Sequence, residues 1–562
     1  MSEVRKNVQN NLRNVKSSEF FWDNMSMLGF KNESRALVMA VKEAIDNAID
    51  SCEDIGVMPD IYLELEDVKE DVIKMVVEDN AGGIPPEEIE NVFGRILYSS
   101  KFGSWKQSRG QQGIGISAVF LWSQKYNGNK TRITSKQPED NKATAIEITA
   151  EQKGKNIKKH QEKEIEWDKE HGTKLEIPIY ANWRSQRHLE EYLKGTSLSN
   201  PSAKITYVKN GDKKIFDRTS NKPQEPPEEI KPHPNSVDIG MLEELIKQTN
   251  TTKVKSFLQN EFCSMDKKGV QRVLKRSDID PENPFILKKD DLERLSNEMR
   301  NLKARAPPKH SLSPLGEDLV ELTLQSYNPE FIGTSTRNLI TIGGHPTIVE
   351  TGIAYGGDIP SGDEVEYYRV ANRVPLVYDS SGCALKKSVT SVDWSRYELD
   401  ESASGHPIGP AIMFVHVCST EVPFGSEAKT FVADQQEIVD EIKLSLEECG
   451  REFSSFVKEK KKRAKQKKKV EKMIPIYKAL NNKLDDVTSI ESDKMIHSIG
   501  DSCNTVIIDD RKETDNVVIN PTPQNRNVTI DGQKVKISPG ESVEFDNEVD
   551  YHYHPVYTTE VY

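Results

Sequence analysis

Three short stretches decide the fold of this 562-residue chain: Glu43-Ala-Ile-Asp-Asn47, Asp79-Asn-Ala-Gly-Gly-Ile-Pro85 and Arg109-Gly-Gln-Gln-Gly-Ile-Gly-Ile-Ser117. The first supplies a carboxylate and an amide, the second an acidic residue followed by glycines, and the third a glycine-rich loop. Each has an ordinary structural explanation when it is taken alone. Together they contain the parts of one nucleotide pocket, and they predict an ATPase.

The first stretch lies in residues 34–52, where apolar residues recur at the spacing of an α-helix. On this period Glu43, Asn47 and Asp50 share the opposite face, with the first carboxylate and the amide one turn apart. Glu43 is a candidate to deprotonate a water that attacks a terminal phosphate, and the amide oxygen of Asn47 is a candidate Mg²⁺ ligand. The alternative is the solvated polar face of a surface helix.

The second stretch follows a predicted buried strand at residues 73–77. The chain leaves this strand at Asp79, and Gly82 and Gly83 then permit a close approach of the backbone to a ligand. An adenine suits this arrangement, because its exocyclic amine can donate to Asp79 while the ring packs on bare backbone. The alternative is a plain strand-to-turn transition in which Pro85 starts the next element.

The third stretch places Gly110, Gly113 and Gly115 ahead of an apolar run at residues 116–122. A glycine loop that enters a helix points free N–H groups at its ligand, so the pattern predicts a phosphate cradle. It is neither a Walker A loop, since it lacks Gly-Lys-Ser/Thr, nor a dinucleotide fingerprint, since no strand immediately precedes it. A flexible surface loop is the alternative.

In order and spacing these stretches resemble the GHKL, or Bergerat-fold, ATPases, which include type II topoisomerases, MutL-type repair proteins, heat-shock chaperones of the ninety-kilodalton class and histidine kinases. Within that group, Phe93-Gly-Arg-Ile-Leu-Tyr-Ser-Ser-Lys-Phe102 and Ser108-Arg-Gly-Gln-Gln-Gly-Ile-Gly-Ile-Ser-Ala118 resemble the B subunits of archaeal DNA topoisomerase VI. The resemblance implies that Glu43 is the general base, Asn47 the Mg²⁺ ligand and Asp79 the residue that reads the adenine of ATP.

The same resemblance implies further nucleotide contacts. Gly83 would lie at the adenine, Ser100 and Lys101 beside the nucleotide, and Thr173, in Gly172-Thr-Lys-Leu-Glu-Ile177, on a strand that approaches the adenine. The lid over the phosphates would consist of Gly110, Gln111, Gln112, Gly113, Ile114, Gly115, Ile116 and Ser117. The chain departs from the family at Ala81, where glycine is usual, and this leaves the local backbone conformation open.

Residues 312–480 alternate strand-like and helical runs, which predicts a mixed α/β domain. Tyr368-Arg-Val-Ala-Asn-Arg-Val-Pro-Leu-Val-Tyr378 and Val422-Pro-Phe-Gly-Ser-Glu-Ala-Lys429 resemble the transducer domain of the topoisomerase VI B subunits. In that family a single transducer lysine reaches the terminal phosphate, and Lys429 is the candidate here. A surface lysine in a loop is the alternative.

The predicted fold class is therefore multidomain α+β. Residues 1–222 would form an N-terminal strap and a GHKL α/β sandwich, and a linker at 221–235 is too rich in proline for regular structure. Residues 237–305 resemble a helix-two-turns-helix domain. Residues 312–482 would be the transducer with a long C-terminal helix, and 509–562 a small β module for which an immunoglobulin-like fold is one option.

The aromatic run Phe20-Phe21-Trp22 is unusual for a free tail. In the resembled family this region is a strap that exchanges between two copies of the ATPase domain. Docking of the run onto its own domain is the alternative.

The net charge of −13 is an average, whereas DNA meets the local surface. Positive charge concentrates in residues 458–472, a run that predicts either a solvated helix or a strip contacting DNA phosphates or a partner protein. A weaker candidate for nucleic-acid contact is the basic set of the helical domain: Lys267, Lys268, Arg272, Lys275 and Arg276.

Six scattered cysteines argue against a disulfide framework and against a zinc site. No apolar run reaches the roughly 18 residues of a transmembrane helix, and the N-terminus is polar. We therefore expect no membrane association, no signal peptide and a cytoplasmic location.

The resemblance implies the ATP-binding and ATP-hydrolysing B subunit of a type IIB DNA topoisomerase. Two such chains would close on ATP and Mg²⁺ around a DNA duplex, and a separate A subunit would cut DNA, in a heterotetramer that relaxes or decatenates DNA. Two alternatives remain. One is another GHKL machine of the MutL-like or chaperone type, and the other is a non-enzymatic DNA-binding scaffold with a degenerate pocket.

Overall fold

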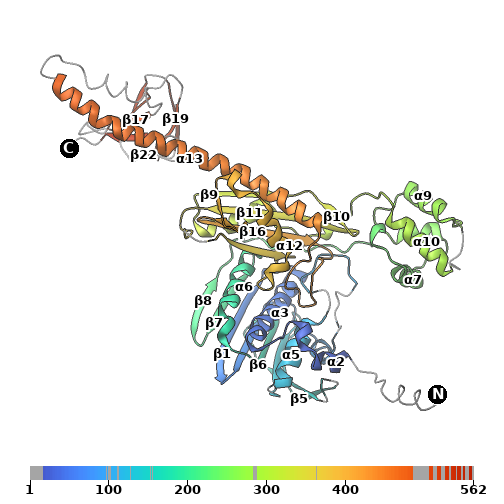
Figure 1. Cartoon of the computed structure of the whole chain (residues 1–562). Coiled ribbons are helices and arrows are strands. Elements are labelled where there is room, and N and C mark those ends of the chain that lie inside the picture. The colour runs from blue at the N-terminus through green and yellow to red at the C-terminus, as the bar shows by residue number, and fades with distance from the viewer. Residues whose placement is uncertain are drawn as a thin grey trace, which may run out of the picture. The chain divides into compact units, whose positions relative to one another are not determined.

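The computed structural model describes most of the chain (Figure 1). The described residues are 17–96, 98, 103–110, 113–126, 128–151, 153–154, 156–282, 288–361, 364–484, 506–509, 516–520, 526–530, 533–538, 541–545, 549–550 and 556–559. The chain divides into two compact units, the first ending at Arg451 and the second beginning at Glu452.

The first unit contains an eight-stranded sheet of order β5-β4-β3-β6-β2-β1-β7-β8. Its strands are β1 (Asp60–Lys69), β2 (Val72–Glu78), β3 (Thr131–Lys136), β4 (Ala143–Glu151), β5 (Asn156–Ile165), β6 (Gly172–Tyr180), β7 (Lys204–Lys209) and β8 (Asp212–Phe216). Paired strands are antiparallel except β1 and β7, which are parallel. The first half of β1 alternates buried and partly exposed residues, as expected for a sheet with one covered face.

Helices cover that face of the sheet: α3 (Glu33–Asp54), α5 (Gly115–Tyr126) and α6 (Gln186–Ser199) (Figure 1). The predicted helix at residues 34–52, the strand at 73–77 and the helix that follows the glycine loop are confirmed. Asn32 fixes the start of α3, since its side chain accepts a hydrogen bond from the backbone N–H of Arg35.

The aromatic run at the N-terminus forms α2 (Ser17–Asp23). Phe21 and Trp22 pack against the core of the eight-stranded sheet, and Nζ of Lys125 donates to the carbonyl oxygen of Trp22 at 2.6 Å. Phe20 stays 43% exposed. Within one chain the run therefore docks on its own domain, and exchange between two copies stays a prediction.

The proline-rich linker has no regular secondary structure over residues 221–233 and ends in a short 3₁₀ helix, Pro234–Ser236. The described residues that follow form the helices α7 (Ile239–Gln248), α8 (Val254–Asn260), α9 (Lys267–Ser277) and α10 (Lys289–Arg300). They enclose a core of their own that includes Leu242, Phe257 and Leu295. The helical pattern predicted for this segment is confirmed.

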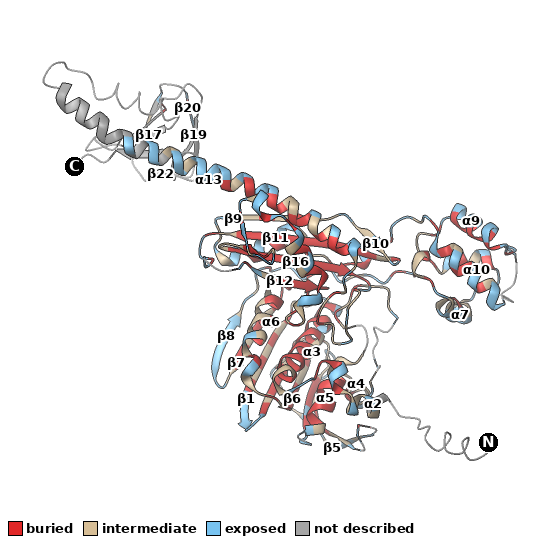
Figure 2. Ribbon diagram, in the orientation of Figure 1, coloured by how far each residue is buried: buried red, intermediate tan, exposed pale blue. Residues whose placement is uncertain are grey.

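A second sheet has the order β10-β11-β16-β12-β13, with β9 also paired to β11. Its strands are β9 (Phe331–Thr336), β10 (Ile340–Ile342), β11 (His345–Tyr355), β12 (Glu366–Ala371), β13 (Val374–Pro375) and β16 (Ala411–Ser419). Nearly every residue of β11 and all of β16 are buried, because both faces are covered (Figure 2). Thr351 of β11 contacts Ser445 of α13 (Gln436–Leu484), whereas the next residue, Gly352, faces α11 (Glu317–Leu324).

The second unit contains the remainder of α13 and two small sheets. One sheet holds β17 (Val506–Asp509), β18 (Asn516–Ile519), β21 (Ser542–Phe545) and β23 (Val556–Thr559), and the other β19 (Arg526–Ile530), β20 (Gln533–Ile537) and β22 (Val549–Asp550). Most of the described residues in 509–562, the segment predicted to be a small β module, lie in these strands. Among the described helices, none combines the length and the apolar composition required to cross a bilayer.

Candidate nucleotide-binding site

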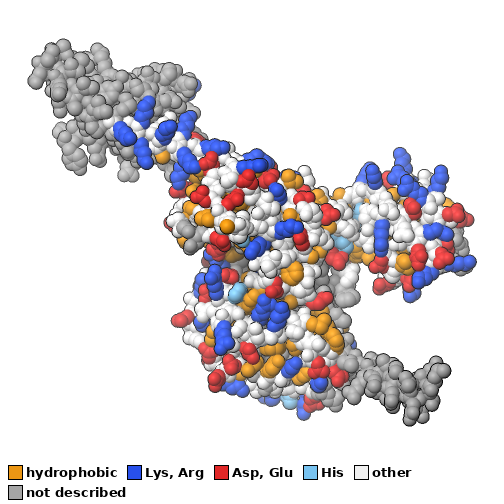
Figure 3. Space-filling model, viewed as in Figure 1, with side chains coloured by type: hydrophobic (Ala, Val, Ile, Leu, Met, Phe, Trp, Pro, Cys, Tyr) orange, Lys and Arg blue, Asp and Glu red, His pale blue; other side chains and the backbone are white. Residues whose placement is uncertain are grey.

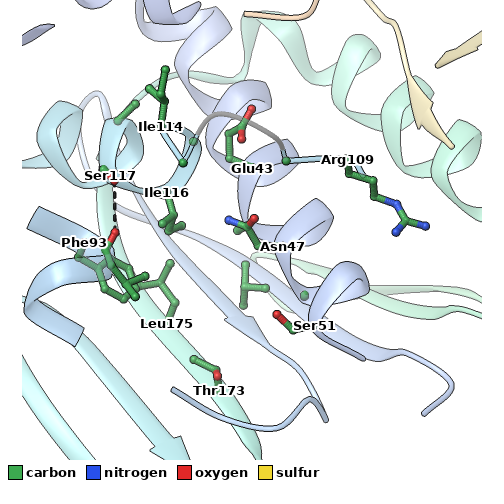
Figure 4. Close-up of a pocket in the computed structure, with 18 of the residues that line it drawn as sticks. Glu43, Asn47, Ser51, Phe93, Arg109, Ile114, Ile116, Ser117, Thr173 and Leu175 are labelled. Atoms are coloured by element: carbon green, nitrogen blue, oxygen red, sulfur yellow. Dashed lines mark hydrogen bonds between the residues drawn. The ribbon is translucent and has the colours of Figure 1, made fainter. Parts of the chain in front are cut away.

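A cavity of about 650 Å³ lies among α3, α5, β6 and the segment after β2 (Figure 4). It brings together residues from all three stretches that the sequence singled out, together with Glu427, Ala428 and Lys429 from the loop after β16. The predicted site residues that line it are Glu43, Asn47, Asp79, Gly83, Gly110, Gly113, Ile114, Gly115, Ile116, Ser117, Thr173 and Lys429. Ser100, Lys101, Gln111 and Gln112 lie outside the described residues.

One face of α3 forms a wall of the cavity. Glu43, Asn47 and Ser51 follow at intervals of four residues and project the same way (Figure 4). Helical spacing alone could have identified Ser51 as well. Asp50 was predicted on this face, but its buried carboxylate turns to Arg109 instead, with Oδ1 2.6 Å from Nη1.

The carboxylate of Glu43 is held by a buried lysine that sequence reasoning missed. Nζ of Lys42 lies 3.3 Å from Glu43 Oε1 and 3.2 Å from Asp46 Oδ2, and the Tyr192 hydroxyl donates to Asp46 Oδ1 at 2.8 Å. Burial works against the charge of Lys42, but the two carboxylates outweigh it and raise the pKa of this lysine. Lys42 therefore stays charged and fixes one oxygen of Glu43.

Gly115, the first residue of α5, packs closely against the other carboxylate oxygen of Glu43. A Cβ atom at this position would lie 1.9 Å from Glu43 Oε2, far inside contact distance. Only glycine lets the amino end of α5 come this close to the carboxylate. Ser117 anchors the same end, since its hydroxyl lies 3.2 Å from the carbonyl oxygens of Val92 and Arg95, at the end of α4 (Ile89–Gly94).

Asp79 lies at the opposite end of the cavity, beside Thr173. Its Oδ1 accepts hydrogen bonds from the N–H groups of Ala81 and Thr173, at 3.0 and 2.8 Å. Burial raises the pKa of Asp79 to about 6, although these two hydrogen bonds oppose the shift. Both bonds reach the same oxygen, so Oδ2 is the atom placed to accept from a ligand.

Ala81 does not distort this end of the cavity. It is not among the described residues with positive φ, so its backbone suits any L-residue. The left-handed position is Gly83, with φ of +73°, where a Cβ atom would meet the Lys136 carbonyl oxygen at 2.5 Å. The methyl group of Ala81 is therefore accommodated, and the required glycine is present two residues later.

Lys429 reaches the cavity from the loop that follows β16. Its Nζ donates to the carbonyl oxygen of Arg109 at 3.1 Å, and its backbone is left-handed, with φ of +50°. Burial, followed by the nearby charge of Lys42, lowers the pKa of Lys429. The cation is thus withdrawn from solvent and points at the start of the glycine loop, which is not the environment of a surface lysine.

Comparison with known proteins adds the family. Residues 307–469 match the family described as "Topoisomerase VI B subunit, transducer", and residues 35–174 match "Histidine kinase-, DNA gyrase B-, and HSP90-like ATPase". The B subunit of type 2 DNA topoisomerase 6 from Methanosarcina barkeri is 37% identical over 482 residues, which are 85% of this chain and 77% of that protein. The chain belongs to the topoisomerase VI B subunit family.

Other topoisomerase VI B subunits match to a similar extent. The protein of Archaeoglobus fulgidus is 39% identical over 80% of this chain and 75% of its own length, and that of Metallosphaera sedula is 35% identical over 81% and 86%. Among solved structures, the ATPase region of Saccharomyces cerevisiae topoisomerase II covers 79% of this chain, with 11% identity and a TM-score of 0.39. A similarity that weak supports no conclusion.

Proposed function

We propose that the cavity binds ATP with Mg²⁺ and that Glu43 activates the water that attacks the terminal phosphate. The chain belongs to the topoisomerase VI B subunits and carries a GHKL-type ATPase domain, so it serves as the ATP-hydrolysing subunit of a DNA topoisomerase. One observation supports this assignment most strongly: the cavity gathers Glu43, Asn47, Asp79, the amino end of α5 and Lys429.

The ends of the cavity suit the ends of ATP. At the adenine end, Asp79 Oδ2 would accept from the exocyclic amine, with Gly83 and Thr173 beside the ring. At the phosphate end, the N–H groups of the first turn of α5 lack partners within the helix and would cradle the phosphates. Ser100, Lys101, Gln111 and Gln112 stay proposed contacts.

Asn47 suits an Mg²⁺ ion, because its neutral amide oxygen lines the cavity one turn from Glu43, and protein-bound Mg²⁺ is usually held by few protein oxygens together with phosphates and waters. The ion would neutralise phosphate charge. The chain itself holds Glu43 between Lys42 and Gly115, so that its carboxylate faces the space where a water can be deprotonated.

Lys429 would sense the terminal phosphate from the transducer. In the closed state its ammonium group would leave the neutral carbonyl oxygen of Arg109 and bind the negatively charged terminal phosphate. Because ADP lacks this phosphate, the contact would favour ATP over ADP. Closure of two copies of this chain, strengthened by exchange of α2, would then enclose a DNA duplex, while a separate A subunit makes the double-strand break. We propose a heterotetramer of two A and two B subunits.

Exposed basic side chains mark two candidate DNA contacts (Figure 3). The α9 set is exposed throughout: Lys267, Lys268, Arg272, Lys275 and Arg276. The second set lies on α13 within residues 458–472, where the described lysines are exposed. If these surfaces contact phosphates, affinity for DNA falls steeply with salt.

Nucleotide-dependent dimerisation tests this proposal. Light scattering on the purified chain with Mg²⁺ should show dimers with ATP or a non-hydrolysable analogue and monomers without nucleotide. The Glu43→Ala variant should remain dimeric on ATP because it cannot hydrolyse it, Lys429→Ala should dimerise less, and Glu87→Ala, at an exposed position, should match wild type. A mass that does not respond to nucleotide would contradict the clamp mechanism for the isolated chain.

A further inference from the structure

Arg109, the residue before the phosphate lid (residues 110–117), takes part in a buried ion triad. Its guanidinium lies on the carboxylate of Glu53 with Nη1–Oε2 at 2.8 Å and Nη2–Oε1 at 3.0 Å. Arg373 approaches the same carboxylate in the same two-pronged way, at 3.0 and 2.8 Å. Glu53 lies in the last turn of α3, and Arg373 lies in the turn between β12 and β13. One carboxylate therefore joins this helix, the residue before the lid and the second sheet.

Charge holds this triad together. All three residues are at most 6% exposed, and without Glu53 two guanidinium groups would share a buried space. Asp50 adds a second carboxylate to Arg109 at 2.6 Å. Burial opposes the charge of Glu53, yet Arg109 and Arg373 lower its pKa, so the bridge stays ionised. Since a buried charge that loses its partner is strongly unfavourable, the three groups are expected to move as one body.

Backbone strain marks the turn that carries Arg373. Asn372 and Arg373 form the two-residue connection between the paired residues Ala371 and Val374, with φ of +48° and +64°. Such turns favour asparagine followed by glycine, and a long side chain in the second place is strained. Arg373 occupies the position where glycine is preferred. Its side chain makes the two contacts with Glu53, and its carbonyl oxygen accepts hydrogen bonds from Ser199 Oγ at 2.8 Å and Asn200 Nδ2 at 3.1 Å. These bonds compensate for the strain of the turn.

The Asn372–Arg373 turn forms hydrogen bonds both with the segment before the phosphate lid and with the second sheet. Toward the lid, Asn372 Nδ2 donates to the Ser108 carbonyl at 3.2 Å. Toward the second sheet, the N–H of Arg373 donates to His416 Nε2 at 3.0 Å, which leaves the proton of His416 on Nδ1, 2.8 Å from Glu350 Oε2. Glu350 also accepts from the backbone N–H groups of Leu315 and Gly316, directly before α11. Both nitrogens of His416 are thus engaged, so Glu350, His416 and Cys418 form a hydrogen-bonded link instead of a metal site.

Two contacts from the transducer therefore reach Arg109, and they differ in one respect. Lys429 binds its carbonyl oxygen from within the cavity, where a phosphate can take the ammonium group away. The Glu53–Arg373 contact reaches its guanidinium outside the nucleotide cavity and does not compete with a ligand.

We propose that Arg373 is a positioning residue that couples the phosphate lid to the transducer sheet, independently of Lys429. The inference rests on the proposed ATPase function. When nucleotide binds and shifts Arg109, this residue carries Glu53 and the Asn372–Arg373 turn with it. His416 and Glu350 then pass the displacement to α11. Lys429 then reports the terminal phosphate, whereas Arg373 keeps the sheet attached to the lid after Lys429 has left Arg109.

Hydrogen–deuterium exchange of the full chain, with and without a non-hydrolysable ATP analogue, tests this coupling. In wild type, the analogue should slow exchange in residues 103–117 and in 366–375. Arg373→Gly removes the side chain and relieves the strained φ, so the variant should fold. We expect it to keep protection in 103–117 and to lose it in 366–375, with KM for ATP within about threefold and kcat lowered about tenfold, a change within the usual range of coupling between sites.

Arg369→Met is the matched control. Arg369 is a buried arginine of the same hairpin, and its guanidinium donates to the carbonyls of Leu376 and Tyr378, at 2.6 and 3.2 Å. The control should keep nucleotide protection in both segments, and Arg373→Lys should restore part of what Arg373→Gly loses. Wild-type protection in Arg373→Gly, or an equal loss in Arg369→Met, would overturn the inference. Absence of ATP binding by wild type would instead overturn the proposed function.

Discussion

The two ends of the cavity are built differently. The adenine end consists of neighbouring strands and their backbone: Asp79 is fixed by two N–H groups, and Gly83 is pressed against the Lys136 carbonyl. The phosphate end is assembled from charged side chains of several elements, including Lys429, which lies 320 residues from its partner Arg109. The first arrangement suits rigid recognition of a base, and the second suits a contact that changes when the phosphate is lost. Substitutions at the two ends should therefore affect different kinetic constants.

The largest effect is expected from Glu43→Gln, which leaves the shape of the phosphate end unchanged and removes the base. We expect kcat for ATP hydrolysis to fall about 10²- to 10⁴-fold, the usual contribution of general base catalysis, with little change in KM. Steady-state hydrolysis measured alongside nucleotide binding checks this. A variant that hydrolyses ATP at the wild-type rate would remove Glu43 from the mechanism.

Gly115→Ala should come next, because its Cβ would overlap Glu43 Oε2. Displacing the carboxylate by about 1 Å is expected to lower kcat about 10²-fold. Gly110→Ala, in the same loop, is the comparison: its Cβ would meet Asn47 Oδ1 at an ordinary 3.6 Å, so it should lose less activity than Gly115→Ala. Equal losses in the two variants would mean that the flexibility of the loop, and not the close contact between Gly115 and Glu43, controls the activity.

At the adenine end, Asp79→Asn should raise KM for ATP and leave kcat at saturation nearly unchanged. A hydrogen bond to a charged group contributes about 1.5 to 3 kcal/mol, so KM should rise about 10- to 100-fold. Titration with ATP and with a nucleotide lacking the exocyclic amine measures this. If the variant discriminates between the two as well as wild type does, Asp79 is not the adenine reader.

The smallest effect should be a pH dependence of ATP affinity. Because burial raises the pKa of Asp79 to about 6, its carboxyl group is mostly protonated in the free protein below that pH. The adenine amine needs the ionised form, so affinity should be full about one pH unit above 6 and about tenfold lower at pH 5. For folding the sign is opposite: a raised carboxyl pKa stabilises the folded chain at low pH, and this contribution is lost as pH rises through 6. Asp79→Asn should abolish both dependences.

Sequence periodicity was sufficient for local elements but not for side-chain partners. It predicted α3, β2 and α5, and it placed Glu43 and Asn47 together, because residues four apart on a helix share a face whatever surrounds them. The same reasoning placed Asp50 on the helix face that carries Glu43 and Asn47. It pairs instead with Arg109, since a buried guanidinium requires a carboxylate and no local pattern shows where that guanidinium lies.

The sequence by itself identified the family and the three stretches that contribute residues to the cavity, because the motifs are short, contiguous and local. Only the tertiary structure decided that Gly115 packs against the carboxylate of Glu43 and that Lys429 binds the carbonyl oxygen of Arg109. It also decided that Arg373, 320 residues from Glu53 in the chain, binds the carboxylate of Glu53 together with Arg109. The physical reason is the distance along the chain over which each kind of interaction acts. Helical and strand periods constrain neighbours in the chain, whereas ion pairs and close backbone contacts depend on which distant surfaces the folded core brings within a few ångströms.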